Sequence, residues 1–480
     1  MSDPELPGRQ GAAPVVGHGI PGAQTPTPNA VIEGNCGLVL KEFAPNSVDL
    51  VATDPPYGIS FMGKDWDKAV PSVEIWKECL RVLKPGAFAF VMSLPRLDVL
   101  SQMTIRLQNS GFRVDFTPLF WAFASGFPKA MNISKAVMKK YGDPGRKVGT
   151  ETIDVGIQSG SMHAGRSVDR RQRDIVVPTH PHAVELDGSY AGFQPKPAVE
   201  VIIVAMKPLS EETYVEQALE NGKGVTWLDS ARIPFASNVD AAIAHDNALG
   251  PVERIDRNKI HRIYEGGKLS GAFPDTFSEK GRFPANLVVS DDALNDGINH
   301  VSGHLDSHTE PPHNQNVYGQ HYPREVYNPG DEGSFSRYFS LDEWWDKRVA
   351  ELPKNVRATF PFLLEPKASK GERNEGLDEF PRKDAFNLGH KENPGRDAPK
   401  KSLPRANHHP TVKPLAIMSY LITLGSRRGD LVLDPFAGSG TTVIAAKMLG
   451  RAGTGIEVNP EYVNIARARL GAVSTIEEWL

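Results

Sequence analysis

The sequence predicts an α/β protein built on a doubly wound, mostly parallel sheet. Short and almost wholly apolar runs alternate with amphipathic runs between residues 31 and 117, and the same alternation returns between residues 411 and 470. Strands that are apolar on both faces are typical of parallel sheets covered by helices on both sides. Several apolar runs end in polar, turn-forming residues, and ligands bind at that edge of such sheets.

The first block of regular structure gives the first half of this sheet. A strand at residues 31–35 ends in Asn35, and the strand Val48–Thr53 ends in Asp54. The carboxyl ends of parallel strands share one edge, so these two polar residues are expected to lie close together. The remaining predicted elements of this half are a helix at 36–43, a helix at 73–83, a strand at 87–93, a helix at 96–109, a strand near 112–117 and a strand at 199–205.

The middle of the chain is less regular. Residues 141–190 are rich in Gly, Asp, Arg and His with little periodicity, which predicts a mobile insertion. Between residues 211 and 404 only a helix near 211–220 and a strand at 286–289 stand out, and so long an irregular stretch indicates a separate module. Regular structure resumes with predicted helices at 415–424, 441–449 and 460–470 and predicted strands at 431–433 and 455–457.

This pattern divides the chain into four parts. Residues 1–28 are rich in Pro, Gly and Ala and read as a disordered tail without the apolar segment of a signal peptide. Residues 29–210 and 405–480 form the two halves of the α/β domain, and residues 211–404 lie between them.

Composition limits the class of protein. With 40% apolar and 23% charged residues the chain is an ordinary globular one, and its net charge of −4 requires any nucleic-acid surface to be local. The two cysteines, Cys36 and Cys79, are too few for a disulfide framework and fit a reducing compartment. The longest apolar run, 198–206, is far too short to span a membrane, so an intracellular protein is expected.

The tetrapeptide Asp54-Pro55-Pro56-Tyr57 predicts a rigid pocket for an amino group on a flat ring. The prolines fix φ and have no N–H, so the Asp54 carboxylate and the Pro55 carbonyl are both free to face a donor. Tyr57 is expected to stack on the ring that carries the amine. A plain strand-to-loop turn is the alternative interpretation.

The segment from Asp434 to Thr442 predicts a binding loop for a nucleoside. Its glycines allow close approach to the backbone at a helix start, and Glu457 ends the next strand, where such sheets place an acid that binds ribose hydroxyls. The loop lacks the Gly-Lys-Ser/Thr that would hold a triphosphate.

Together the two motifs resemble those of the amino-methylating DNA methyltransferases that use S-adenosylmethionine. In that family Asp-Pro-Pro-Tyr carries catalysis and Asp-Pro-Phe-x-Gly-x-Gly-Thr carries the cofactor, and the order found here is similar to the permuted beta arrangement. The segments 193–200, 281–286 and 409–414 are also similar to phage and bacterial DNA methylases.

The resemblance implies a circularly permuted, Rossmann-like methyltransferase sheet with an inserted target-recognition module at 211–404. It implies that residues 31–35 form the strand that follows Glu457 in the sheet. The residues it implies for catalysis are Asp54, Pro55, Pro56 and Tyr57. Those it implies for the cofactor are Asn35, Thr411, Lys413, Asp434, Pro435, Phe436, Ala437, Gly438, Ser439, Gly440, Thr441 and Glu457. The family usually has Asp at the position that Asn35 occupies here.

The implied partner is double-stranded DNA, with the target base flipped into the pocket, in the cytoplasm of a bacterium or a phage-infected host. Asp at position 54 favours adenine N6 over cytosine N4, because cytosine enzymes more often begin this motif with Ser. An inactive DNA-binding relative is a weaker alternative, and a homodimer stays open. The five histidines between 300 and 321 have no tight ligand spacing, so a solvated loop is expected there and no metal site.

Overall fold

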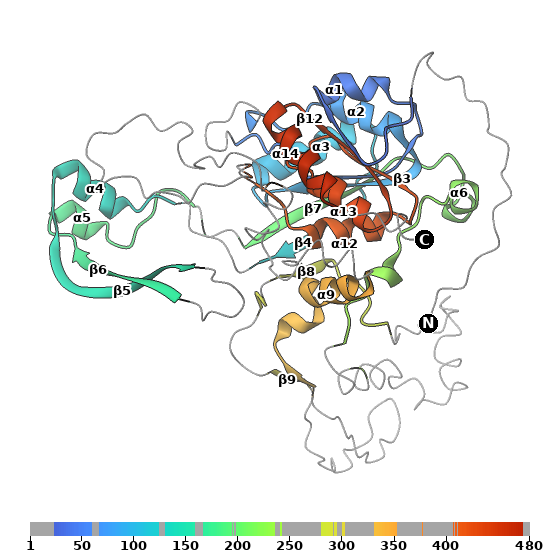
Figure 1. The fold of residues 1–480 in the computed structure, drawn as a ribbon. Helices are drawn as coiled ribbons and strands as arrows, with labels where there is room; N and C mark the ends of the chain where they lie inside the picture. The colour runs from blue at the N-terminus through green and yellow to red at the C-terminus, as the bar shows by residue number, and fades with distance from the viewer. Residues whose placement is uncertain are drawn as a thin grey trace, which may run out of the picture. The chain divides into compact units, whose positions relative to one another are not determined.

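The computed structural model describes residues 24–59, 67–123, 130–158, 167–193, 195, 198–235, 241, 280–290, 292–294, 300–302, 331–352, 377, 407, 409 and 411–473. The chain divides into two compact units. One comprises Met1–Ala124 with Val199–Leu480, and the other is Ser125–Ala198 (Figure 1).

The first unit is built on an eight-stranded sheet in the order β1-β12-β11-β2-β3-β7-β4-β8. Its strands are β1 (Ala30–Glu33), β2 (Val48–Thr53), β3 (Leu83–Ser93), β4 (Leu119–Ala122), β7 (Val199–Met206), β8 (Leu287–Val289), β11 (Leu431–Asp434) and β12 (Ala452–Glu457). Neighbouring strands are parallel except that β7 runs antiparallel to β3 and to β4. The predicted doubly wound, mostly parallel sheet is therefore confirmed.

The two ends of the chain meet in this sheet. β1, the first strand, pairs in parallel with β12, the last one, and aligns Ala30 with Thr454. β11 in turn pairs with β2, which brings the C-terminal strands beside the N-terminal ones. This is the permuted order predicted from the sequence.

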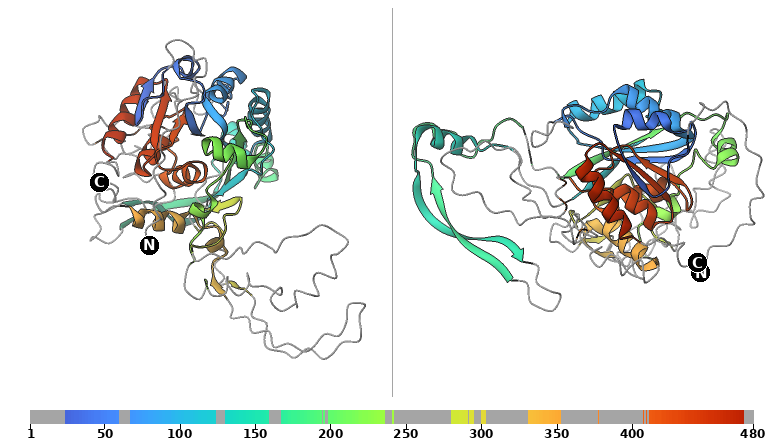
Figure 2. Two further views of the ribbon diagram at one scale, coloured as in Figure 1. Left: turned by 90° about the vertical axis from the view of Figure 1, so that its right-hand side faces the viewer. Right: turned by 45° about the horizontal axis from the view of Figure 1, so that its top comes forward.

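Helices cover both faces of the sheet, as Figure 2 shows with the blue helices on one side and the red ones on the other. The helices α1 (Cys36–Val39), α2 (Val73–Val82) and α3 (Leu97–Asn109) pack on one face, and α12 (Leu415–Gly425), α13 (Thr441–Met448) and α14 (Pro460–Gly471) pack on the other. Along β3, Ala87, Ala89 and Val91 enter the first core. Phe88, Phe90 and Met92 enter the second core. Both faces of the central strands are buried, which explains their unbroken apolar sequences.

Three predicted elements of this unit need correction. The strand expected at 87–93 begins at Leu83, immediately after the helix α2 ends at Val82. The helix expected at 36–43 ends at Val39 and continues as a 3-10 turn to Glu42. The strand expected near 112–117 lies instead at Leu119–Ala122. In the segment expected as a strand, Phe112 is buried, but the pairing with the sheet is limited to an isolated antiparallel bridge between Arg113 and Met206.

The range 211–404 contributes to the sheet unit through its described residues. The predicted helix is α6 (Tyr214–Asn221), and the predicted strand is β8, which pairs with β4. Sequence reasoning missed the helix α9 (Leu341–Glu351), whose Trp344 packs edge-on against Tyr420 of α12. The short strands β9 (His300–Ser302) and β10 (Asp331–Gly333) pair with each other. The role of this range in target recognition remains a prediction.

The second unit has more regular structure than its sequence suggested. β5 (Arg146–Gln158) and β6 (Ser167–Val177) form an antiparallel ladder, with α4 (Ile133–Tyr141) and α5 (Pro181–Glu185) in the same unit. The sequence did not indicate these strands and helices, and the predicted mobility of residues 141–190 stays a prediction. Charged side chains pair across the ladder, as Lys147 does with Asp174 at 2.6 Å. The described side chains of this ladder are mostly exposed, so they give the sequence no buried apolar face to show.

Candidate active site

The two predicted motifs meet at the carboxyl edge of the parallel strands. β2 ends at Thr53, immediately before Asp54, and β11 ends at Asp434. The Thr53 hydroxyl donates a hydrogen bond of 2.6 Å to the Asp434 carboxylate, across 381 residues of sequence. The catalytic and cofactor motifs predicted from sequence are thus adjacent in space.

Asp434 is a buried joint between these motifs. One carboxylate oxygen accepts from Thr53 and from the Phe436 N–H, and the other accepts from the Thr442 hydroxyl at 2.6 Å. Burial raises the pKa of Asp434 to about 6, although these hydrogen bonds oppose the shift. Asp434 was predicted to bind the cofactor, and its contacts show how it holds the shape of the loop that follows it.

Asp54 stands in a cluster of charged and hydroxyl groups. The Tyr57 hydroxyl donates to one Asp54 oxygen at 2.5 Å, and the Lys413 ammonium lies 3.0 Å from the other. The same ammonium lies 3.0 Å from a carboxylate oxygen of Glu200. The side chains of Asp54, Glu200 and Lys413 are only 19%, 17% and 12% exposed, so these charges interact with little screening by water.

This cluster fixes the protonation of its members. Burial lowers the pKa of Lys413, but the carboxylates of Asp54 and Glu200 outweigh it and hold that pKa above its usual range. Burial, together with the negative charges of Asp54 and Glu200, raises the pKa of Tyr57 well above its usual value. The cluster therefore contains a protonated lysine and a neutral tyrosine at physiological pH.

Tyr57 is held by its backbone as well as by its hydroxyl. Its N–H and that of Gly58 both donate to one oxygen of the buried Asp67, at 2.7 and 2.9 Å. The Lys413 ammonium lies 5.6 Å from the centre of the Tyr57 ring. The predicted role of this ring as a stacking wall for a base remains a proposal.

The glycine loop after β11 is shaped by close contacts. Gly438 and Gly440 have φ values of +52° and +83°, which favour glycine. A Cβ on Gly438 would lie 2.8 Å from the ring of His409. Behind the loop, the buried Arg469 donates to the Ser439 carbonyl at 2.6 Å and to the Thr441 hydroxyl at 3.4 Å. These two predicted cofactor residues therefore face an internal arginine.

Glu457, at the end of β12, faces the glycine loop. One carboxylate oxygen accepts from the Gly438 N–H at 2.9 Å and the other from the Asn459 N–H at 2.8 Å. Burial raises the pKa of Glu457 to about 7, against the effect of these hydrogen bonds. A carboxylate has about four acceptor sites, which leaves capacity for a further donor such as a hydroxyl.

The raised pKa values of Glu457 and Asp434 predict a pH effect on stability. Both carboxyls bind protons more tightly in the folded than in the unfolded chain, where they titrate near 4.5 and 3.8, so their contribution to the free energy of unfolding falls as pH rises towards 7. In Glu457→Gln the gain in melting temperature between pH 7.5 and pH 5.5 should be smaller than in the wild type. Thermal unfolding at both pH values measures it, and an unchanged gain would contradict the assignment to Glu457.

The five other predicted cofactor residues make local contacts or are buried. The Asn35 side chain caps α1 by accepting from the Gly37 N–H at 2.9 Å. The Thr411 N–H donates to the His409 ring at 3.3 Å. Pro435 is buried, Phe436 is half-buried with its ring 6.1 Å from that of Trp76, and Ala437 donates its N–H to Ile456. Asn35 therefore serves as a helix cap, whatever else it contacts.

Three residues at the site were not singled out by sequence reasoning. Glu200 is the second residue of β7 and lies beside Lys413. Asp67 accepts hydrogen bonds from the N–H groups of Tyr57 and Gly58, and the His409 ring packs beside Gly438. Only His409 and Glu200 lay in segments with a family resemblance, so a signal existed for two of them. No sequence pattern marked Asp67.

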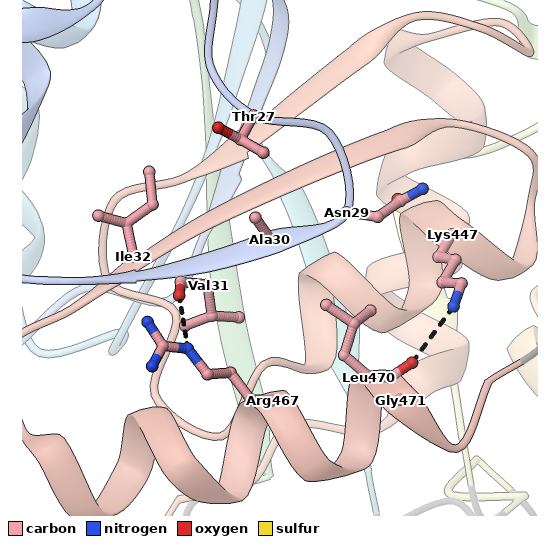
Figure 3. A pocket seen from close by; sticks show the side chains of 9 residues that line it. All are labelled: Thr27, Asn29, Ala30, Val31, Ile32, Lys447, Arg467, Leu470 and Gly471. Carbon is pink, nitrogen blue, oxygen red and sulfur yellow. Dashed lines mark hydrogen bonds between the residues drawn. The ribbon is translucent and has the colours of Figure 1, made fainter.

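Other features of the described residues do not form part of this site. A hollow of about 500 Å³ lies along β1 and α14, with Arg467 donating to the Val31 carbonyl and Lys447 donating to the Leu470 carbonyl (Figure 3). None of the predicted site residues lines it. Within the described ranges, no cluster of three metal-ligating side chains occurs, and no helix has the length and apolarity needed to cross a membrane. Of the five histidines considered for zinc, only His300 lies within those ranges.

Comparison with known proteins agrees with the predicted resemblance. Residues 304–468 match the N6/N4 family model described as DNA methylase. The chain is 49% identical over 67 residues to the type II methyltransferase M2.DpnII of Streptococcus pneumoniae, which covers 14% of this chain and 25% of that protein. It is 50% identical over 62 residues to the type II methyltransferase M.HpaI of Haemophilus parainfluenzae, covering 13% of this chain and 20% of that protein.

The matched stretch therefore spans about a quarter or less of these relatives' own length. Among solved structures, the M1.HpyAVI–SAM complex aligns with 92% of this chain and 98% of its own, with a TM-score of 0.34 and 14% identity. The resemblance to amino-methylating DNA methyltransferases, inferred from two short motifs, is confirmed by the family model and by the curated relatives.

Proposed function

We propose that this protein transfers a methyl group from S-adenosylmethionine to the exocyclic amino group of a base in double-stranded DNA, and that the base is adenine, methylated at N6. The observation that carries the proposal is the adjacency of the Asp54 tetrapeptide and the glycine loop, joined by the hydrogen bond from Thr53 to Asp434. The residues predicted to bind the amino group of the base and those predicted to bind the nucleoside of the methyl donor would then lie at the same edge of the sheet.

The residues at the end of β11 and β12 fit a nucleoside cofactor. Glu457 can accept hydrogen bonds from ribose hydroxyls, because a carboxylate has more acceptor sites than the backbone N–H groups beside it occupy. Gly438 and Gly440 allow the left-handed turn of this loop, and their Cβ positions face His409 and Ala466. Phe436 is half-buried beside them and offers an apolar ring edge. The bound cofactor supplies an electrophilic methyl group on a positively charged sulfur.

The Asp54 cluster fits the nucleophile of this reaction. An exocyclic amine is a poor nucleophile because its lone pair is delocalised into the ring. The Asp54 carboxylate and the Pro55 carbonyl would accept hydrogen bonds from the amine and localise that lone pair on nitrogen. As the nitrogen bonds to the methyl carbon it becomes positively charged, and the Asp54 carboxylate stabilises that charge and is available to accept the departing proton.

The cysteines support transfer to an amine rather than to cytosine carbon 5, which needs a thiolate nucleophile. Cys36 and Cys79 are both buried. Burial raises the pKa of Cys36 to about 11, and it also raises the pKa of Cys79 well above its usual value. Neither thiol is therefore in the ionised form that attack on a base requires.

A base in a duplex is stacked, so it must rotate out of the helix to reach Asp54. Tyr57 is proposed as its stacking wall. In the structure its hydroxyl is tied to Asp54 and its backbone to Asp67, which would hold the ring in a defined position when a base arrives. The recognition sequence depends on which side chains reach the groove.

Transfer of labelled methyl to unmethylated genomic DNA tests the proposal. The wild-type protein should label the DNA, and mass spectrometry of its nucleosides should find N6-methyladenine. N4-methylcytosine alone would overturn the adenine assignment and keep amino-methylation. Absence of label on DNA of any sequence, with cofactor bound, would favour a DNA-binding protein without transfer activity.

A further inference from the structure

One carboxylate at the site has no place in either motif. Glu200 lies on β7, the one strand of the main sheet that runs antiparallel to its neighbours. Because of that direction the start of β7, rather than its end, lies at the carboxyl edge of the parallel strands. Glu200 thereby reaches the Lys413 ammonium, 3.0 Å away, which is also 3.0 Å from Asp54.

The cluster brings together groups from three separate parts of the sequence. Asp54 follows β2, Glu200 is the second residue of β7, and Lys413 precedes α12. Two carboxylates and one ammonium give the cluster a net charge of −1. With Lys413 and Asp54 alone the pair would be neutral, and its attraction for a positive charge would be weak.

We propose that Glu200 is a positioning residue, which holds the Lys413 ammonium between two carboxylates so that Asp54 keeps a fixed geometry within a negatively charged cluster. The inference rests on the proposed methyl transfer and names a further residue that serves it. Lys413, predicted as a cofactor ligand, would then belong to the catalytic carboxylate instead.

The charge flow of the reaction explains why a net negative cluster matters. Before transfer the positive charge is on the sulfur of the cofactor and the amine is neutral. The bond from nitrogen to the methyl carbon forms as the carbon–sulfur bond breaks, its electron pair stays on sulfur, and the positive charge appears on nitrogen. Fixed negative charge beside the nitrogen stabilises this change, most strongly where water is excluded. Loss of Glu200 would leave the cluster neutral.

The test is steady-state and single-turnover methyl transfer to DNA by Glu200→Gln. The variant should lower kcat about 10- to 100-fold, as expected when a catalytic group loses its support. Its dissociation constant for S-adenosylmethionine should stay close to that of the wild type. Glu200→Asp should recover part of the lost kcat because it restores the charge. A variant with wild-type kcat, or one whose only defect is in cofactor binding, would overturn the proposal.

A double-mutant cycle with Lys413→Met separates positioning from an independent effect. If Glu200 acts through Lys413, Glu200→Gln should change kcat little when Lys413 is already absent. An equal reduction in both backgrounds would show that Glu200 acts without Lys413, and the proposal would be wrong.

Asp49 offers a matched control on the same unit. It is a buried carboxylate near the start of β2, paired with Lys223 at 2.8 Å and Lys84 at 2.6 Å, and makes no contact with the Asp54 cluster among the interactions described. Asp49→Asn should lower the melting temperature and leave kcat of the folded protein near wild type. A similar kcat loss in both variants would point to general destabilisation. If the wild type itself transfers no methyl group, the proposed function fails, whereas an active wild type with unaffected Glu200→Gln refutes this inference alone.

Discussion

Asp54→Ala is expected to reduce methyl transfer to DNA by about 1000-fold, the scale on which removal of one group that stabilises transition-state charge acts. The substitution removes the carboxylate that accepts from Tyr57 and pairs with Lys413, and with it the proposed acceptor for the target amine. Single-turnover transfer of labelled methyl to saturating DNA measures the loss directly.

Cofactor binding gives the control for this variant. The Glu457 carboxylate and the Gly438 loop make their contacts without Asp54, so the dissociation constant for S-adenosylmethionine should change little. Asp54→Asn keeps the size of the side chain and one acceptor oxygen, so it should retain more activity than alanine. Loss of cofactor binding in Asp54→Ala would identify Asp54 mainly as a cofactor ligand and would contradict its catalytic role.

The sheet could be predicted because its central strands are buried on both faces. β2 and the part of β3 after Gly86 are short, mostly apolar runs, which is the pattern of a buried strand. The proximity of Asp54 to Asp434 could also be predicted. Each residue lies at the end of a strand, and the family resemblance placed both strands in one sheet. The hydrogen bond from Thr53 to Asp434 joins the two strand ends directly.

The partners of the Asp54 carboxylate could not be predicted in the same way. A strand's direction is set by how it pairs, and nothing in the apolar sequence of β7 shows that it runs antiparallel. In a sheet assumed to be wholly parallel, Glu200 is therefore expected near the start of its strand, at the edge away from the ligand. The motif that Lys413 occupies predicts a cofactor ligand, whereas the structure places its ammonium 3.0 Å from a carboxylate oxygen of both Asp54 and Glu200.

Gly438→Ala is expected to weaken cofactor binding severely and to lower stability. A φ of +52° costs an L residue about 1–2 kcal/mol, and the new Cβ would lie 2.8 Å from the His409 ring. That ring cannot move freely, since it is buried, packs edge-on against Tyr462 at 4.5 Å and accepts from the Thr411 N–H. The loop must then shift, and the Gly438 N–H leaves Glu457. Calorimetric titration with S-adenosylmethionine and thermal unfolding measure the two effects.

Gly429→Ala separates the clash from the backbone strain. Gly429 has a φ of +82° in the turn before β11, but a Cβ there would meet nothing within 4 Å. It should therefore lose stability on the scale of the left-handed conformation alone, about 1–2 kcal/mol, and keep cofactor affinity. In the double variant Gly438→Ala/His409→Ala the clash with the His409 ring is removed. The loss of stability caused by the left-handed conformation of residue 438 should remain. If Gly438→Ala and Gly429→Ala have the same effects on stability and cofactor affinity, the His409 ring does not fix the position of the Gly438 loop, and the prediction is wrong.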